Sequence, residues 1–346
     1  MTSTASPPAA APARAETAPR PPAFDPGRLL SDPDGCAVLT EVVGRLRAAG
    51  YDAGPDAADD AAARGDTSIS TLVALAGRRG VTEPDAVAAL GVEGVGVLLR
   101  CGLLVRHQGE LVLTARLFPM RSIYTLLPSP HPDQDIVYLG PDSHVLFETV
   151  WAARGFGDRA VDLATGNGFL AAALATRYDH VIAADLSRRC VTTAALVPVV
   201  NPHLRTRVSV VQMDVAEGLQ PGAFDLVTAN PPWVPETVGP DGGPSRRFAA
   251  GGPTGFELPR RFIDAAADLL APGGRAFVAC LDIVFADGRR PLAEHLPQLT
   301  ARGFDVTIFE TRLNGTFDYG AWAAGKAPHA TAARHVIVDV RRPPRG

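Results

Sequence analysis

Apolar residues recur along the chain with two different periods, and the change of period divides it into two regions. Between residues 36 and 104 they are spaced three and four apart, which is typical of amphipathic helices. From Arg159 onward, short apolar runs alternate with helical segments, the pattern of a parallel sheet with crossover helices. The sequence therefore predicts a helical N-terminal region followed by an α/β region.

In the N-terminal region the periodicity predicts helices over 36–49, 70–79, 83–90 and 95–104. Two short strands follow, 104–106 and 111–113, around a four-residue turn that indicates a hairpin. Helices followed by a hairpin form a winged-helix-like order, which suits DNA binding, substrate capping or dimerisation. We favour a cap or a dimerisation module, because Arg100 is the only basic side chain of the candidate recognition helix.

The α/β region predicts seven strands, at 159–163, 180–185, 207–212, 224–229, 274–281, 305–311 and 334–341. The helices between them are predicted at 168–177, 187–199, 258–271 and 289–302. A long insertion with glycines and aromatic residues, 312–332, separates the last two strands. We therefore expect a Rossmann-like seven-stranded sheet preceded by a helical, winged-helix-like domain.

The domain boundaries follow from composition. Residues 1–27 are rich in alanine and proline and are expected to be a disordered tail, and 28–118 to be the cap or dimerisation domain. The proline-rich passage 119–143 is expected to link this domain to the sheet domain, 144–346. Asp142 or Ser143 is a candidate N-cap for a helix over 144–153, and a cofactor contact from this segment is an equally weighted alternative.

Composition excludes several classes of protein. The 346 residues are 46% hydrophobic with a net charge of −4 and no long basic run, which makes nucleic acid a less favoured partner. No apolar run is long enough to span a bilayer, and the N-terminus does not resemble a signal peptide. The four cysteines are widely scattered: Cys36, Cys101, Cys190 and Cys280. They suggest neither a metal site nor a disulfide framework, which fits a cytoplasmic protein.

A glycine-rich loop follows the first predicted strand. Gly166, Gly168 and Ala171 satisfy the G-x-G-x-x-G/A fingerprint, and Asp185 lies about 20 residues further on, where it can bind ribose hydroxyls. Such a loop can bind a dinucleotide. However, Asp162 on the preceding strand disfavours a pyrophosphate and suits S-adenosylmethionine, which carries an ammonium and a sulfonium group.

Asp214 follows the third predicted strand of the sheet. Its carboxylate is placed to accept from an adenine amine, while Met213 or Val215 packs against the ring. The alternative is that Asp214 caps a short helix starting at Ala216, and the sequence does not separate the two.

The fourth predicted strand ends in the tetrapeptide Asn230-Pro231-Pro232-Trp233. The prolines stiffen the turn and remove two backbone donors, so the Asn230 amide oxygen and the Pro231 carbonyl are candidate acceptors for a substrate N–H pair. Trp233 offers a flat face for stacking. The alternative is a proline-terminated strand with an aromatic plug. In an open α/β sheet, however, ligands bind at this end of the strands.

Together these motifs resemble those of the class I S-adenosylmethionine-dependent methyltransferases, over about residues 136–310. The N-P-P-aromatic signature and the segment from Gly251 to Glu257 are similar to the branch that contains release-factor glutamine and adenine-amine methyltransferases. The resemblance implies that the cofactor site contains Asp162, Ala164, Gly166, Gly168, Asp185, Leu186, Asp214, Val215 and Asn230. It implies that the catalytic corner is Asn230, Pro231, Pro232 and Trp233.

The sequence thus predicts a methyltransferase that acts on a nitrogen of a small molecule, a peptide or a protein side chain. The alternatives are an RNA adenine-amine methyltransferase, a carboxylate O-methyltransferase and a non-enzymatic winged-helix ligand sensor. His329 and His335 are expected to be structural, because the product nitrogen can lose its proton after transfer without a strong base. The N-terminal region departs from the helical substrate domain of the glutamine enzymes, which leaves the acceptor open.

Overall fold

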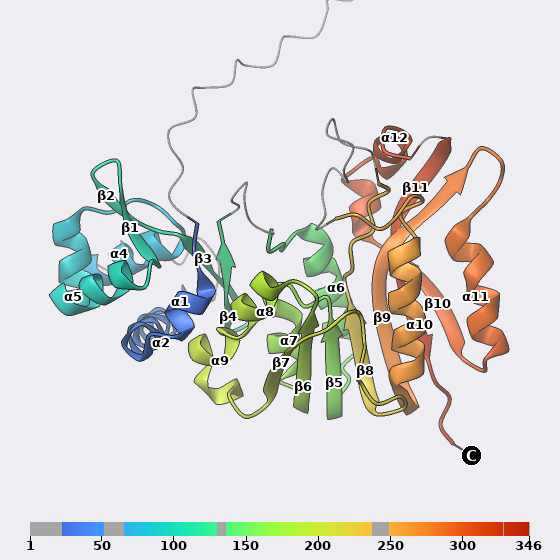
Figure 1. Ribbon diagram of the computed structural model, residues 1–346, viewed down its shortest axis with the longest axis horizontal. Coiled ribbons are helices and arrows are strands. Elements are labelled where there is room, and N and C mark those ends of the chain that lie inside the picture. Colours follow the sequence, from blue (N-terminus) through green and yellow to red (C-terminus); the bar gives the residue numbers. More distant parts are fainter. Residues whose placement is uncertain (1–22, 52–65, 130–135, 237–248, 328, 346) are drawn as a thin grey trace, which may run out of the picture.

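The computed structural model describes residues 23–51, 66–129, 136–236, 249–327 and 329–345 (Figure 1). The N-terminal module contains α1 (Pro26–Leu30), α2 (Pro33–Ala48), α4 (Thr67–Ala76) and α5 (Glu83–Arg100), followed by the hairpin of β1 (Leu104–His107) and β2 (Glu110–Leu113). The two helices predicted over 83–104 are merged into α5, which is kinked at Gly91 where φ is 72°. Winged-helix character for this module stays a prediction.

The only basic residue in the last turn of α5 is already paired. Arg100 contacts Asp32 at 3.0 Å and Asp34 at 3.3 Å, at the start of α2. The one basic side chain of this helix is thus engaged within the module, and a role of the module as a cap or in dimerisation stays a prediction.

A second hairpin follows, formed by β3 (Ala115–Met120) and β4 (Ile123–Pro128). Its second strand lies within 119–143, the segment that the sequence suggested as a linker. The linker prediction was wrong here because the proline-rich composition hid the strand pattern. Tyr124 and Leu126 of β4 are buried in the core of the N-terminal module, together with Leu196 and Val200 from the sheet domain. Phe24 is also fully buried, so the ordered fold begins ahead of residue 28.

The seven-stranded sheet is confirmed, with the strand order β10-β11-β9-β8-β5-β6-β7. Its strands are β5 (Gly157–Leu163), β6 (Tyr178–Asp185), β7 (Val208–Gln212), β8 (Phe224–Ala229), β9 (Leu270–Phe285), β10 (Asp305–Glu310) and β11 (Ala330–Arg341). The first five are parallel, and β11 lies antiparallel between β9 and β10. The carboxyl ends of β5, β6, β7 and β8 therefore meet at one edge.

Helices cover both faces of the sheet (Figure 1). One core contains residues of α6 (Pro141–Ala152), α7 (Phe169–Leu174) and α12 (Tyr319–Ala324), and another contains residues of α10 (Glu257–Leu269) and α11 (Pro291–Ala301). Alternate residues of β5 enter the two cores, Ala160 the first and Val161 the second, as strand geometry requires. The helix predicted over 187–199 is broken at Leu196 into α8 (Arg188–Ala194) and α9 (Val197–Val200).

The start of α6 differs from the prediction. The N-cap is Gly140, Pro141 occupies the first helical position and Ser143 the third. Asp142 and Ser143 are therefore inside the helix, where Asp142 is free for contacts other than capping. Among the described residues no helix combines the length and the apolar character needed to cross a membrane.

Candidate active site

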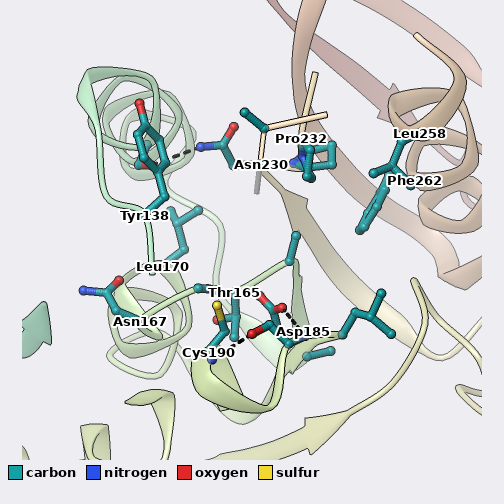
Figure 2. Close-up of a pocket in the computed structure, with 18 of the residues that line it drawn as sticks. Tyr138, Thr165, Asn167, Leu170, Asp185, Cys190, Asn230, Pro232, Leu258 and Phe262 are labelled. Carbon is teal, nitrogen blue, oxygen red and sulfur yellow. Dashed lines mark hydrogen bonds between the residues drawn. The ribbon is translucent and has the colours of Figure 1, made fainter. Parts of the chain in front are cut away.

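A pocket of about 1290 Å³ lies at the carboxyl ends of β5, β6, β7 and β8 (Figure 2). This volume is above the 300–1000 Å³ of common small-molecule sites, so it has room for a cofactor and part of a second reactant. Most of the residues that the sequence suggested for the site line this pocket. They are Ala164, Gly166, Asp185, Leu186, Asp214, Val215, Asn230, Pro231, Pro232 and Trp233.

The glycine-rich loop adopts a tight turn that needs left-handed backbone. Ala164, Gly166 and Gly168 have φ angles of 56°, 59° and 79°. Gly166 lines the pocket, whereas Gly168 serves packing: a Cβ there would lie 2.7 Å from Cγ2 of Val197 on α9. The role of Gly168 is therefore to let the loop approach α9 closely.

Asp162 lies beneath the pocket and is absent from its lining. The side chain is fully buried and accepts from the hydroxyls of Thr165 at 2.6 Å and Thr228 at 2.7 Å. Burial raises the pKa of Asp162 to about 7, against the lowering effect of those two hydroxyls. Its observed contacts position Thr165 and the loop, in place of the direct electrostatic contact with a cofactor that the sequence suggested.

Asp185 ends β6 and its carboxylate organises the loops on either side. One oxygen accepts from the N–H of Gly166 and the other from the N–H of Ser187, both at 2.9 Å. Burial raises the pKa of Asp185, while these two donors oppose the rise. The Cys190 side chain also bonds to this carboxylate, whose roughly four acceptor sites leave room for a further donor such as a ribose hydroxyl. Leu186, next in the chain, is 65% exposed at the pocket wall.

Asp214 follows β7 in a turn and does not cap a helix: the N–H of Glu217 bonds to the Asp214 carbonyl at 2.9 Å, and no helix follows. Its carboxylate pairs with Arg261 of α10 at 2.8 Å. The opposite wall consists of Leu258 and Phe262 of α10 (Figure 2). Neither residue belongs to a recognisable motif, so the sequence did not indicate them.

The amide of Asn230 has a defined orientation. Its nitrogen donates to Oδ2 of Asp142 at 2.8 Å and to Oγ of Ser143 at 3.0 Å, both in the first turn of α6. Because an ionised carboxylate only accepts, the NH₂ end of the amide must face Asp142. Oδ1 is then left buried beside the pocket, with no hydrogen-bond partner among the residues that the structure describes.

Asp142 is itself held in place. It is 4% exposed, and its Oδ1 accepts from the hydroxyl of Tyr138 at 2.7 Å. Tyr138, Asp142 and Ser143 all line the pocket, so the segment before α6 is part of the site. The sequence analysis weighed capping and a cofactor contact equally for this segment, and it did not indicate the contact with Asn230.

Trp233 is half-buried in an aromatic cluster. The rings of Tyr319, Trp322 and His335 lie 6.3, 6.1 and 5.6 Å from the Trp233 ring, each edge-on. Tyr319 and Trp322 belong to α12, within the 312–332 insertion. This insertion therefore fixes the orientation of Trp233, the stacking residue suggested from the sequence.

Glycines allow another segment to pack against the backbone of the same corner. A Cβ at Gly251 would lie 2.7 Å from Cα of Trp233, and one at Gly255 would lie 2.8 Å from its carbonyl oxygen. The glycine-rich stretch that precedes α10 thus packs directly against the backbone of Trp233. Its sequence reflects this close packing.

His335 is fully buried on β11, where Nδ1 lies 3.0 Å from Oγ1 of Thr311. Burial lowers the pKa of His335 to about 4, so the imidazole is neutral at neutral pH. Its contacts with Thr311, Asn314 and the Trp233 ring are those of a structural residue, as expected. His329 is exposed and lies outside the pocket lining.

The charge of the described pocket wall favours a cation. It carries three carboxylates, Asp142, Asp185 and Asp214, and one basic side chain, Arg188. A pyrophosphate would meet a net negative wall, whereas a sulfonium with an ammonium group would be attracted.

The family model of the methyltransferase small domain matches residues 139–241. This region is thus similar to a methyltransferase domain. It contains α6, the glycine-rich loop, Asp185, Asp214 and the Asn230 corner, which are the elements that build the pocket. The match confirms the resemblance to methyltransferases that the sequence motifs indicated.

A curated relative is similar over part of the chain. The ribosomal protein uL3 glutamine methyltransferase of Bordetella pertussis is 35% identical over 126 residues, which is 34% of this chain. The aligned part spans 41% of that relative's own length.

Solved structures are also similar to part of the chain. The Mtq2–Trm112 complex of E. cuniculi, described as responsible for methylation of the eRF1 translation termination factor, matches 60% of this chain and 97% of its own. Its identity is 20% and the TM-score 0.40. Trm5b from Pyrococcus abyssi matches 68% of this chain and 61% of its own, with 15% identity and a TM-score of 0.44.

The cofactor of this domain is S-adenosylmethionine, as the family match indicates, and the residues present fit it. The wall has net negative charge, and Asp185 has lone pairs beside the glycine-rich loop. Leu186, Met213 and Phe262 provide apolar surface for a purine.

Proposed function

We propose that this protein methylates an amide or amine nitrogen, with the side-chain amide of a glutamine in a peptide or protein as the leading candidate acceptor. The observation that carries the proposal is the orientation of Asn230. Asp142 and Ser143 bind its nitrogen, and its buried Oδ1 has no hydrogen-bond partner within the described part of the chain. An acceptor oxygen kept free in a buried corner suits a substrate that brings an N–H donor.

The corner can activate a weak nucleophile. The lone pair of an amide nitrogen is delocalised into the carbonyl, so it is a poor nucleophile in solution. Oδ1 of Asn230 and the carbonyl of Pro231 would accept hydrogen bonds from the two N–H groups of the methyl acceptor. This would turn the lone pair of the acceptor nitrogen toward the methyl group of the cofactor. Bound S-adenosylmethionine supplies an electrophilic methyl group on a sulfonium.

The same two acceptors favour the transition state over the ground state. Positive charge develops on the nitrogen as it is methylated, and preorganised oxygen acceptors stabilise that charge more than the neutral amide. The proton leaves the nitrogen after transfer, so a strong base is not required. Asp142 contributes by preventing the Asn230 amide from presenting its own N–H groups to the acceptor.

The choice of a glutamine amide rests on the relative from Bordetella pertussis, which is named for that activity. An ionised carboxylate is a poorer fit, because its oxygens and Oδ1 of Asn230 would both be acceptors and would repel. The exocyclic amine of adenine brings the same N–H pair, and Trp233 offers it a stacking surface at the pocket wall. Adenine is therefore retained as an arm of the test.

The experiment is to incubate the protein with S-adenosylmethionine labelled in the methyl group and three acceptor sets. These are glutamine-containing peptides, RNA oligonucleotides and a cell extract, with Asn230→Ala as the control. Mass spectrometry locates the label. We expect it on a side-chain amide nitrogen with the unsubstituted protein and not with the variant. Label found on carboxylate oxygens alone would overturn the proposal, and label on adenine would replace glutamine as the acceptor.

A further inference from the structure

Asn167, which lies between Gly166 and Gly168 of the glycine-rich loop, contacts the N-terminal module. The side chain of Asn167 extends away from Asp185 in Figure 2. Its nitrogen donates to Oγ1 of Thr125 at 3.1 Å and to the carbonyl of Leu126 at 3.3 Å, both on β4. Asn167 and Thr125 are each 1% exposed, so the contact is shielded from water. A bond of this kind is costly to break without a replacement partner.

The loop conformation depends on such support. Of the five residues from Ala164 to Gly168, Ala164, Gly166 and Gly168 have left-handed backbone. Ala164 carries a Cβ, which disfavours this conformation. The strain of a non-glycine residue in this region is about 1–2 kcal/mol, so the surroundings must hold the turn. Asp162 holds it from below through Thr165, and Asp185 holds it from the β6 side through the N–H of Gly166.

The strand that receives Asn167 is a fixed part of the N-terminal module. Leu126 packs in the same buried cluster as α2, α4 and α5, and the N–H of Ser129 bonds to the carbonyl of Thr114. On the other side, Asn201 binds both the N–H and the carbonyl of Tyr124, at 2.9 and 2.7 Å. The position of β4 is therefore set jointly by the module and by the segment after α9.

We infer that the N-terminal module positions the cofactor loop through Asn167, so that cofactor affinity depends on a contact made outside the sheet domain. Asn167 is then a positioning residue: it acts on the cofactor site through the conformation of Gly166 and its neighbours. Thermodynamic linkage makes the coupling reciprocal, so a partner that shifts β4 changes cofactor affinity, and the cofactor changes affinity for that partner. This inference is independent of which nitrogen is methylated.

The test uses two buried threonines of the module in the full-length protein. Thr125→Val removes the hydroxyl that binds Asn167. Thr114→Val is the matched control, since Thr114 is fully buried and its hydroxyl bonds to the carbonyls of Gly102 and Leu103, which are not part of the loop. Calorimetry gives the Kd for S-adenosylhomocysteine, and thermal unfolding gives the Tm of each variant.

We expect Thr125→Val to weaken binding about two- to tenfold, the loss of one net hydrogen bond, and Asn167→Ala to weaken it further. Thr114→Val should lower Tm as Thr125→Val does and leave the Kd unchanged. In the cofactor-free protein, the amides from Gly166 to Gly168 should exchange hydrogen faster in Thr125→Val and Asn167→Ala.

A double-mutant cycle separates transmission through this bond from general loosening. In an Asn167→Ala background, Thr125→Val should have no further effect on the Kd, because its partner is already absent. The inference is overturned if Thr125→Val and Asn167→Ala both bind as the unsubstituted protein does. It is equally overturned if Thr125→Val weakens binding just as much without Asn167, or if Thr114→Val weakens it by the same factor.

Discussion

The side-chain nitrogen of Asn230 lies 2.8 Å from Oδ2 of Asp142, and this contact decides which end of the Asn230 amide faces the pocket. Asp142→Asn should remove that control, because an asparagine at 142 can either donate or accept and so permits both orientations of Asn230. We expect kcat to fall by about one to two orders of magnitude. This is at most the effect of removing one preorganised catalytic partner outright. The Kd for S-adenosylhomocysteine should change little. Steady-state kinetics with the identified acceptor and calorimetry give the two quantities.

Tyr138→Phe is the matched control for this experiment. It removes the hydroxyl that binds the other oxygen of Asp142 and leaves the bond to Asn230 in place. Its kcat should stay well above that of Asp142→Asn. Equal kcat losses in the two variants would mean that Asp142 acts by general packing and not by orienting the amide.

Asp185 is expected to carry much of the cofactor affinity. Asp185→Ala removes the carboxylate that binds the N–H groups of Gly166 and Ser187 and that is placed to accept ribose hydroxyls. Each lost charge-assisted bond costs about 1.5–3 kcal/mol, so binding of S-adenosylmethionine should weaken by at least tenfold. Calorimetry with S-adenosylmethionine and with NAD measures this. Tight NAD binding with no response to S-adenosylmethionine would contradict the cofactor assignment.

Asp162 should make stability depend on pH. Burial raises its pKa to about 7 in the folded protein, against about 3.9 for an unperturbed aspartate. The folded state therefore holds this proton more tightly than the unfolded chain. The contribution of Asp162 to the free energy of unfolding is then fully present below pH ~4 and is lost as the pH rises through about 7.

Asp162→Asn removes the ionisable group, so its free energy of unfolding should fall less between pH 5 and 8 than that of the unsubstituted protein. Urea denaturation of both proteins across this range measures the difference. Shifted groups that do not interact with Asp162, such as His335, are common to both and cancel in the comparison. Parallel pH profiles would show that Asp162 does not hold the proton.

Much of the sheet domain could be predicted because its signals are local. Apolar runs of strand length end in Asp185, Gln212 and Ala229, and the sheet shows those strands within a few residues of the predicted bounds. The pocket residues contributed by strand ends were predictable for the same reason. Parallel strands bring their carboxyl ends to one edge, so motifs at successive strand ends must meet.

The parts that could not be predicted depend on contacts between distant segments. Asp142 and Asn230 are 88 residues apart, and nothing in either local sequence states that they bind. The hairpin of β3 and β4 contains Pro119 and Pro128, which suggested a linker, yet tertiary burial of Leu126 stabilises the strand pair. A direct contact of Asp162 with the cofactor was expected from its charge and its place on the strand before the loop, and neither tells that its side chain is buried beneath the pocket.

Trp233 is expected to contribute mainly to acceptor binding. Its ring lines the pocket and is held edge-on by Tyr319 and Trp322, so it forms a rigid apolar wall. Contact with such a wall stabilises the ground state and the transition state alike, so Trp233→Ala should raise KM with a smaller change in kcat. Trp322→Ala, which only loosens the wall, should show the same trend to a lesser degree. A large fall in kcat at unchanged KM would instead assign Trp233 a role in the chemical step.

Asn230→Ala separates binding from chemistry at the centre of the site. Asn230 ends β8, while the loop and carboxylate expected to bind the cofactor belong to the ends of β5 and β6, so cofactor affinity should be nearly unchanged. The lost amide oxygen is expected to contact the acceptor nitrogen most strongly as that nitrogen gains positive charge. Removing one such preorganised partner typically lowers the rate by about 10²–10³.

Asn230→Asp is the informative companion: it keeps an acceptor oxygen but places a carboxylate 2.8 Å from that of Asp142, so it should recover only part of the rate. Full activity of Asn230→Ala on the identified acceptor would exclude nitrogen alignment by this corner and favour an oxygen acceptor, which brings no N–H pair for Asn230 to bind.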